Sequence, residues 1–230
     1  WEFQYYTNNR SNSYTRDGTL YLKPTLTADA FGEAFLTSGT LDLWGLADPN
    51  YCTGNSFYGC LRVGNPDNYI NPIQSARIRT IKSFAMRYGK VEVEAQLPRG
   101  DWIWPAIWML PKHEAYGSWP ASGEIDIMES RGNNDLKCGE NSIGNDAYSA
   151  TLHWGPSFYY NRYEMTGAEK HSNWADAFHR FGAEWDENSL KLTVDDEVIL
   201  DVNPPDGGFW EYGNFELPDE SNPWREGDKM

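Results

Sequence analysis

Three carboxylates lie within six residues of one another, at Glu124, Asp126 and Glu129, and large apolar residues separate them. On a β-strand the side chains alternate between two faces, so Glu124 and Asp126 share a face. Glu129 is out of phase by one position, and a β-bulge at Ile127 and Met128 would return it to that face. Because crowded acids repel one another, such a cluster is typical of cation binding or proton chemistry. A solvated acidic strand is the alternative.

The elements that must position these acids have the pattern of short strands separated by turns. Hydrophobic patterns predict strands at residues 20–23, 41–44, 76–80, 91–97, 106–110, 150–154, 180–185, 190–194 and 198–202. The run 106–110 is apolar on both faces and is predicted to be a buried central strand, while only residues 173–178 favour a helix. Many short strands with Gly and Pro turns indicate an all-β fold, a β-sandwich or jelly roll. With no internal repeat or linker, we expect one domain, residues 1–230.

The charge balance narrows the class of ligand. Asp and Glu outnumber Lys and Arg by 34 to 19, which gives a net charge of −15. Nucleic acids and anionic membrane surfaces both require basic patches, so this balance argues against nucleic-acid and membrane partners. Aromatic residues make up 15% of the chain, and the flat faces of its 11 Trp and 14 Tyr suit sugar stacking as well as core packing. A neutral or cationic ligand fits these features.

The cysteines indicate an oxidising compartment. Cys52 and Cys60 close a short Gly-rich loop, and a disulfide between them would constrain it. Cys138 would then have no partner within this chain. No cysteine or histidine spacing indicates a zinc site. The sequon Asn9-Arg10-Ser11 is consistent with secretion, so we expect a secreted protein.

Residues 123–129 resemble the signature of glycoside hydrolase family 16, Glu-hydrophobic-Asp-hydrophobic-x-Glu. The flanks are similar to the β-1,3-glucanase (laminarinase) branch of the family, which is related to invertebrate β-glucan-recognition proteins. The similar segments follow in order along the chain, at residues 75–78, 88–92, 104–111 and 117–123. The resemblance implies a β-sandwich jelly roll with a substrate cleft across its concave sheet, in agreement with the predicted strands.

The resemblance also implies roles for the three acids. A retaining glycosidase needs two carboxyl groups about 5–5.5 Å apart. By the family pattern, Glu124 is the nucleophile and Glu129 the general acid and base. Asp126 lies between them and would hydrogen-bond the nucleophile and tune its charge. A strand rises about 3.3 Å per residue, so the two glutamates must lean toward each other over Asp126.

Five further residues match segments that the family uses around its sugar. Trp104, Trp108 and Trp119 would line sugar-binding subsites, with core packing as the alternative for each. Arg77 could hydrogen-bond sugar hydroxyls or the nucleophile, or make a surface ion pair. His153 lies on the strand expected beside the acidic one, where it could assist the general acid, bind sugar or be structural.

The chain departs from the family pattern at both ends. It begins at Trp1, where the family has an earlier strand, and ends at Met230, where the family continues into a long core strand. We therefore expect an incomplete portion of the domain, completed by terminal segments absent from this chain. We expect no required cofactor and a monomer. A structural calcium ion occurs in the family near the termini, so its ligands cannot be placed here and the metal site stays unassigned.

Three functional classes compete. The first is retaining endo-hydrolysis of β-1,3-glucosidic bonds in laminarin-like β-glucans by double displacement. The second is non-catalytic β-glucan recognition, and the third is hydrolysis of mixed-linkage glucan or a galactan on the same fold. Because recognition relatives have lost catalytic carboxylates and all three acids are present here, the sequence favours the hydrolase.

Overall fold

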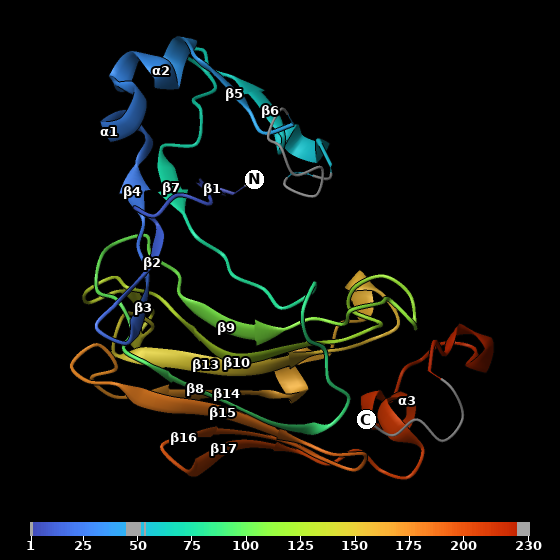
Figure 1. Cartoon of the computed structure of the whole chain (residues 1–230). Helices are drawn as coiled ribbons and strands as arrows, with labels where there is room; N and C mark the ends of the chain where they lie inside the picture. Colours follow the sequence, from blue (N-terminus) through green and yellow to red (C-terminus); the bar gives the residue numbers. More distant parts are fainter. Residues whose placement is uncertain (1, 45–51, 53, 225–230) are drawn as a thin grey trace. The chain divides into compact units, whose positions relative to one another are not determined.

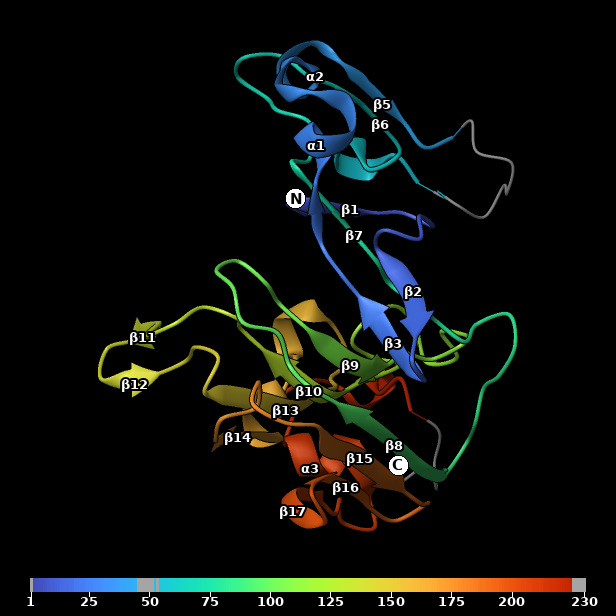
Figure 2. The same ribbon diagram turned by 60° about the vertical axis from the view of Figure 1, so that its left-hand side comes forward.

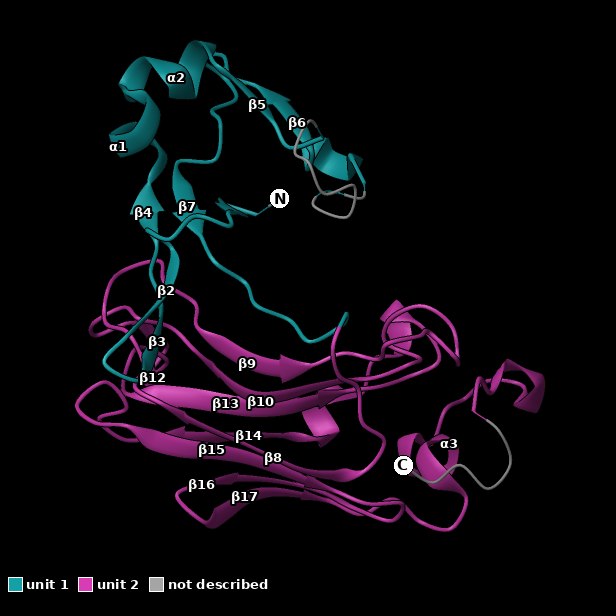
Figure 3. Ribbon diagram, in the orientation of Figure 1, with its two compact units in different colours: residues 1–82 teal, residues 83–230 magenta. Residues whose placement is uncertain are grey.

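The computed structural model describes residues 2–44, 52 and 54–224 (Figure 1). The chain divides into two compact units, Trp1–Lys82 and Ser83–Met230, which are coloured separately in Figure 3. The expectation of a single catalytic domain stays a prediction.

The first unit is built from short strands and two short helices (Figures 1 and 2). A three-stranded sheet has the order β1-β7-β4, with β1 parallel and β4 antiparallel to β7. The unit also contains two separate antiparallel strand pairs, β2–β3 and β5–β6. The bounds are β1 Gln4–Tyr6, β2 Ser13–Arg16, β3 Thr19–Leu22, β4 Thr25–Leu26, α1 Thr27–Phe31, α2 Glu33–Ser38, β5 Thr40–Asp42, η1 Ser56–Tyr58, β6 Leu61–Val63 and β7 Ile73–Ser75.

A small core and a disulfide hold the first unit together. Its buried apolar cluster consists of Tyr5, Leu41 and Ile70, which is small for 82 residues. The predicted disulfide between Cys52 and Cys60 is confirmed, with a Cα–Cα distance of 5.6 Å. A crosslink of this kind stabilises a unit whose core is small, because it restricts the unfolded chain.

The second unit contains two four-stranded antiparallel sheets, which lie as stacked layers in Figure 1. The first has the order β14-β13-β10-β9 and the second β17-β16-β15-β8. The bounds are β8 Gly89–Ala95, β9 Ala106–Met109, β10 Glu124–Ser130, β11 Lys137–Cys138, β12 Asn141–Ser142, β13 Ala147–His153, η2 Phe158–Tyr160, η3 Tyr163–Met165, β14 Gly167–His171, β15 His179–Trp185, β16 Leu190–Val194, β17 Glu197–Val202, α3 Gly208–Gly213 and η4 Asp219–Ser221.

The core of the second unit lies between these sheets. The inward positions alternate along β16, where Leu190, Leu192 and Val194 are all buried. They belong to one apolar cluster with Ile127 of β10 and Leu152 of β13. Burial of one large apolar side chain contributes about 1.5–3 kcal/mol to the free energy of folding. This apolar layer therefore holds the two sheets together and fixes the backbone of β10 on its core-facing side.

Three expectations about single elements are wrong. Residues 76–80 lie beyond the end of β7 at Ser75 and form no strand. Among the described residues β9 is an edge strand of its sheet rather than a central one. Its apolar pattern has another cause, because Ile107 and Met109 pack on the core while the opposite face carries Trp108. Residues 173–178 form turns rather than a helix. The reason is that the carbonyl groups of Trp174 and Ala175 accept hydrogen bonds from Leu97 and Gln96, both just beyond the end of β8. Within the described ranges, no helix is long and apolar enough to cross a membrane.

Candidate active site

The three acids lie on β10, whose register shifts in mid-strand. Against β13 the shift falls between Asp126 and Glu129, and against β9 between Asp126 and Met128. The consecutive side chains of Ile127 and Met128 are both buried in the core, which breaks the alternation of the strand. The predicted bulge is therefore confirmed, and it returns Glu129 to the face of Glu124 and Asp126.

Each glutamate accepts a hydrogen bond from a tryptophan indole. The Nε1–H of Trp119 donates to Oε2 of Glu124 at 2.5 Å, and the Nε1–H of Trp104 donates to Oε1 of Glu129 at 3.1 Å. Trp119 is half-buried, whereas Trp104 is 60% exposed and carries the guanidinium of Arg131 over its ring at 5.0 Å. The structure thus brings two of the three predicted tryptophans to the acids, one at each end of the cluster.

Asp126 is the most buried of the three acids and has a histidine partner. Its carboxyl group is 2% exposed, and Oδ2 lies 3.2 Å from Nε2 of His153. His153 sits directly opposite Glu124 in the ladder between β10 and β13. The predicted position of His153 beside the acids is therefore confirmed, and its partner is the central acid rather than Glu129.

Asn161 determines which nitrogen of His153 carries the proton. Its Oδ1 accepts the backbone N–H of Trp154 at 3.3 Å, so its Nδ2 points to Nδ1 of His153 at 2.9 Å. An amide NH₂ can only donate, which makes Nδ1 an acceptor and leaves the proton on Nε2. The neutral ring of His153 then donates to Asp126.

Burial and mutual repulsion raise the pKa of both glutamates. For Glu124 and for Glu129 burial is the larger cause, and the charge of Asp126 adds to it. The indole hydrogen bonds act in the opposite sense. Both glutamates therefore hold protons more tightly than a free side chain does. The direction is the same for both, so their separate roles rest on the family pattern.

The surroundings of His153 act on its pKa in two directions. Burial lowers the pKa of His153, but the hydrogen bond and charge of Asp126 outweigh burial and raise it. The amide of Asn161 opposes protonation, because a second ring proton on Nδ1 would face another donor.

The remaining predicted residues fall in two places. Trp108 pairs with Asp126 in the ladder between β9 and β10, so both point to the same face of the sheet. Arg77 belongs to the first unit, where its guanidinium lies 6.0 Å from the ring centroid of Tyr6. Its role near the acids stays a prediction.

Three further residues, which are not among the predicted site residues, contact Trp119 and His153 beside the acids. The ring of Phe158 lies 5.8 Å from that of Trp119, and Tyr163 lies 5.4 Å from His153. Together with Asn161 they come from the connection between β13 and β14. A signal for the two aromatic residues was present, since the aromatic-rich run 158–163 follows shortly after a predicted strand that carries a candidate site residue.

No group of three or more His, Cys, Asp or Glu side chains in the described ranges is arranged to hold a metal ion. The structural calcium ion therefore stays a prediction without assigned ligands.

The model of the glycosyl hydrolases family 16 matches residues 60–218 of the chain. The chain is 53% identical to a beta-1,3-glucan-binding protein of Penaeus monodon, in an alignment covering 100% of the chain and 62% of that protein. It is 31% identical to glucan endo-1,3-beta-glucosidase A1 of Niallia circulans, covering 87% of the chain and 24% of that protein. The chain thus spans less than two thirds of either curated relative.

Among solved structures, the laminarinase catalytic domain from Thermotoga maritima superposes with a TM-score of 0.54 at 25% identity, covering 88% of this chain and 62% of that one. Together with the family match and the two stacked sheets, this similarity confirms the predicted all-β jelly-roll class. The bulged acidic strand is where the signature of the family was predicted. The chain therefore belongs to family 16 of the glycosyl hydrolases.

Proposed function

We propose that this chain carries the catalytic residues of a retaining endo-hydrolase that cleaves β-1,3-glucosidic bonds in β-glucans. One observation carries the proposal: a bulge in β10 places Glu124, Asp126 and Glu129 on one face, with an indole bonded to each glutamate. Similarity to a β-1,3-glucan-binding protein, an endo-1,3-β-glucosidase and a laminarinase supports this choice of substrate.

The first chemical step forms a bond between sugar and protein. The ionised carboxylate of Glu124 attacks the anomeric carbon, while the carboxylic acid of Glu129 gives its proton to the departing glycosidic oxygen. The fixed charge of Asp126 favours this pairing, since it raises the pKa of both glutamates and so helps one of them keep a proton.

The second step releases the sugar. Once Glu124 is an ester it carries no charge, so Glu129, which has given up its proton, does not face a charged Glu124 carboxylate. Glu129 can then take a proton from water, whose oxygen attacks the anomeric carbon and frees Glu124. Two inversions at one carbon retain its configuration.

The surroundings favour a neutral, hydroxyl-rich substrate. The indole N–H groups of Trp104 and Trp119 donate hydrogen bonds to the two glutamates. The flat faces of their rings are suited to packing against the C–H faces of sugars. The negative charge of the chain disfavours an anionic polymer. We also propose that the protein is secreted, as the disulfide between Cys52 and Cys60 and the sequon at Asn9 support, and that it acts as a monomer.

Glucan recognition without cleavage is the second candidate. The 53% identity to a protein named for glucan binding favours it. The same face of the sheet can bind a glucan without cleaving it, because Trp104 and Trp119, which would stack on the sugar, are distinct from the acids that would catalyse hydrolysis. Hydrolysis of mixed-linkage glucan or a galactan is the third candidate, and it requires the same acids.

Incubation of the full chain with laminarin separates the three candidates. We expect new reducing ends to appear with the parent and none above background with Glu124→Gln, although the variant still binds the polymer. Binding of laminarin by the parent without new reducing ends would favour recognition. Reducing ends from mixed-linkage glucan or agar alone would favour the third candidate.

A further inference from the structure

A line of aromatic rings leads away from the Glu124 end of the acidic cluster and becomes more exposed along its length. It begins at Trp119, which donates to Glu124, and continues through Phe158 at 5.8 Å to Tyr159 at 5.6 Å. Phe158 is 67% exposed and Tyr159 is 89% exposed. Large aromatic side chains that are next to each other and exposed to solvent indicate a binding surface rather than part of a core.

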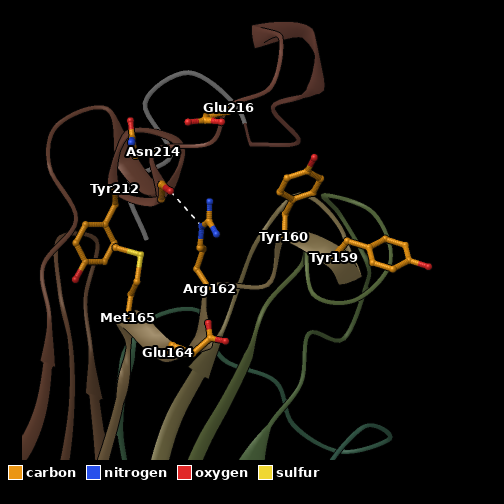
Figure 4. Close-up of a pocket in the computed structure, with 9 residues that line it drawn as sticks. Tyr159, Tyr160, Arg162, Glu164, Met165, Tyr212, Asn214 and Glu216 are labelled. Atoms are coloured by element: carbon orange, nitrogen blue, oxygen red, sulfur yellow. Dashed lines mark hydrogen bonds between the residues drawn. The ribbon is translucent and has the colours of Figure 1, made fainter.

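The line ends at a pocket of about 580 Å³ in the second unit (Figure 4). Two segments form it, the connection between β13 and β14 and the end of α3 with the residues that follow. Figure 4 shows Tyr159 and Tyr160 on one side and Tyr212 with Met165 on the other. The lining also includes Arg162, Glu164, Asn214 and Glu216.

Arg162 is held in place between these segments. Its Nε–H donates to the carbonyl oxygen of Gly213 at 3.2 Å, and its guanidinium lies 4.9 Å from the ring centroid of Phe215. The backbone N–H of Arg162 donates to the carbonyl of Trp154 at 2.8 Å. The two walls of the pocket are therefore tied together by one side chain, which favours a preformed site.

The chemistry of the lining suits a neutral polyol. Glu164 and Glu216 outnumber the single cation, Arg162, so an anionic ligand is disfavoured. The amide of Asn214, the tyrosine hydroxyls and the two carboxylates supply both donors and acceptors, while the rings supply flat apolar surface. The volume is within the range of small-ligand sites, about 300–1,000 Å³.

We propose that this pocket is a distal sugar-binding subsite, reached by a glucan chain that extends past Trp119 over Phe158 and Tyr159. The inference rests on the proposed function, because it takes its ligand from continuity with the acidic site. It adds a consequence that the acids alone do not have: affinity increases with chain length until a sugar reaches the pocket.

Calorimetric titration with β-1,3-linked glucose oligomers of increasing length tests the proposal. The Glu124→Gln background keeps the ligands intact. In this background Tyr159→Ala and, separately, Glu216→Gln are compared with Phe84→Ala, a control for loss of an exposed ring in the same unit. We expect Tyr159→Ala to weaken binding of long oligomers by about tenfold, equivalent to about 1.4 kcal/mol, with a smaller loss for Glu216→Gln.

The shortest oligomers that bind should be unaffected by either pocket variant, and Phe84→Ala should change neither class. Equal affinity of the parent and Tyr159→Ala for every length would overturn the subsite and leave the proposed function intact. A uniform loss at all lengths would also overturn it, since it would place Tyr159 in the acidic site. Absence of binding at any length would remove both the subsite and the choice of β-glucan as substrate.

Discussion

At the scale of single residues, the chemistry depends on the different surroundings of three neighbouring carboxyl groups. Every carboxyl group in the cluster accepts a hydrogen bond from a different side chain: Trp119, Trp104 or His153. Hydrogen bonds to a carboxylate stabilise its charged form, whereas burial and neighbouring charge oppose it. For Glu124 and Glu129 these causes act on the pKa in opposite directions, and the raising causes outweigh the hydrogen bonds.

The role of Glu129 predicts a dependence on the leaving group. Glu129→Gln removes the proton donor, and the rate on laminarin should fall by about 10²–10⁴-fold. Aryl glucosides with good leaving groups need no proton, so their first step should be much less affected. The values of kcat/KM on both substrates check this, because kcat/KM reports the first step and excludes the second, in which Glu129 acts as the base. An equal loss on both would contradict the role of Glu129 as the acid.

The contact between Asn161 and His153 predicts a change of tautomer. In Asn161→Asp an acceptor replaces the donor that faces Nδ1, while the acceptor for the N–H of Trp154 is kept. The pKa of His153 should rise further, with both ring nitrogens protonated at neutral pH. Nitrogen-15 NMR of the ring measures this, and the exposed His171 is an internal control. A proton on Nδ1 in the parent would contradict the assignment.

At this scale the sequence predicted the acids and both tryptophans that bond them, because acidic spacing and flanking motifs are local signals. It did not select Asn161. Nothing in its type or spacing distinguishes it, and its role appears only when the connection after β13 folds back on His153.

At the scale of elements, β10 combines a core strand with an acidic surface. Ile127 and Met128 attach it to the core, and the bulge that they create aims Glu129. The sequence predicted this bulge because the out-of-phase acid had no other way to join the cluster. It was wrong about β9, since a strand with tryptophan on one face and core residues on the other has the same apolar pattern as a central strand.

The acidic face of β10 predicts that the folded state is less stable at neutral pH, where Glu124 is ionised, than it would be without this charge. Burial and the charge of Asp126 raise the pKa of Glu124, so the folded state holds this proton more tightly than the unfolded chain. The stabilisation is complete below the ordinary glutamate pKa, about 4.3, and is lost as the pH rises through the raised value. Glu124→Gln should therefore melt at a higher temperature than the parent at pH 7, with a smaller difference near pH 4.

Thermal unfolding of the parent and the variant at both pH values measures this difference. Glu187→Gln, which removes an exposed acid from a turn, is the matched control and should shift the melting temperature less. A Glu124→Gln variant that is less stable than the parent at pH 7 would show that the charged carboxylate stabilises the fold instead.

At the scale of the whole molecule, composition and strand pattern predicted the all-β class, and the family match confirms it. The disulfide was also predicted, because Cys52 and Cys60 are close in sequence. The position of Arg77 could not be tested in the same way. It lies in the first unit and the acids lie in the second, so its distance from them depends on more than local pattern.

The most direct test of the account is capture of the covalent sugar–protein intermediate. The full chain is incubated with a 2-deoxy-2-fluoro β-1,3-glucoside that carries a good leaving group. The fluorine slows both chemical steps and the good leaving group restores the rate of the first, so the covalent intermediate accumulates. The protein is then digested and analysed by mass spectrometry. The account predicts one adduct, on Glu124, that is absent from Glu124→Gln. No adduct on the folded parent, or an adduct on any other residue, would contradict it.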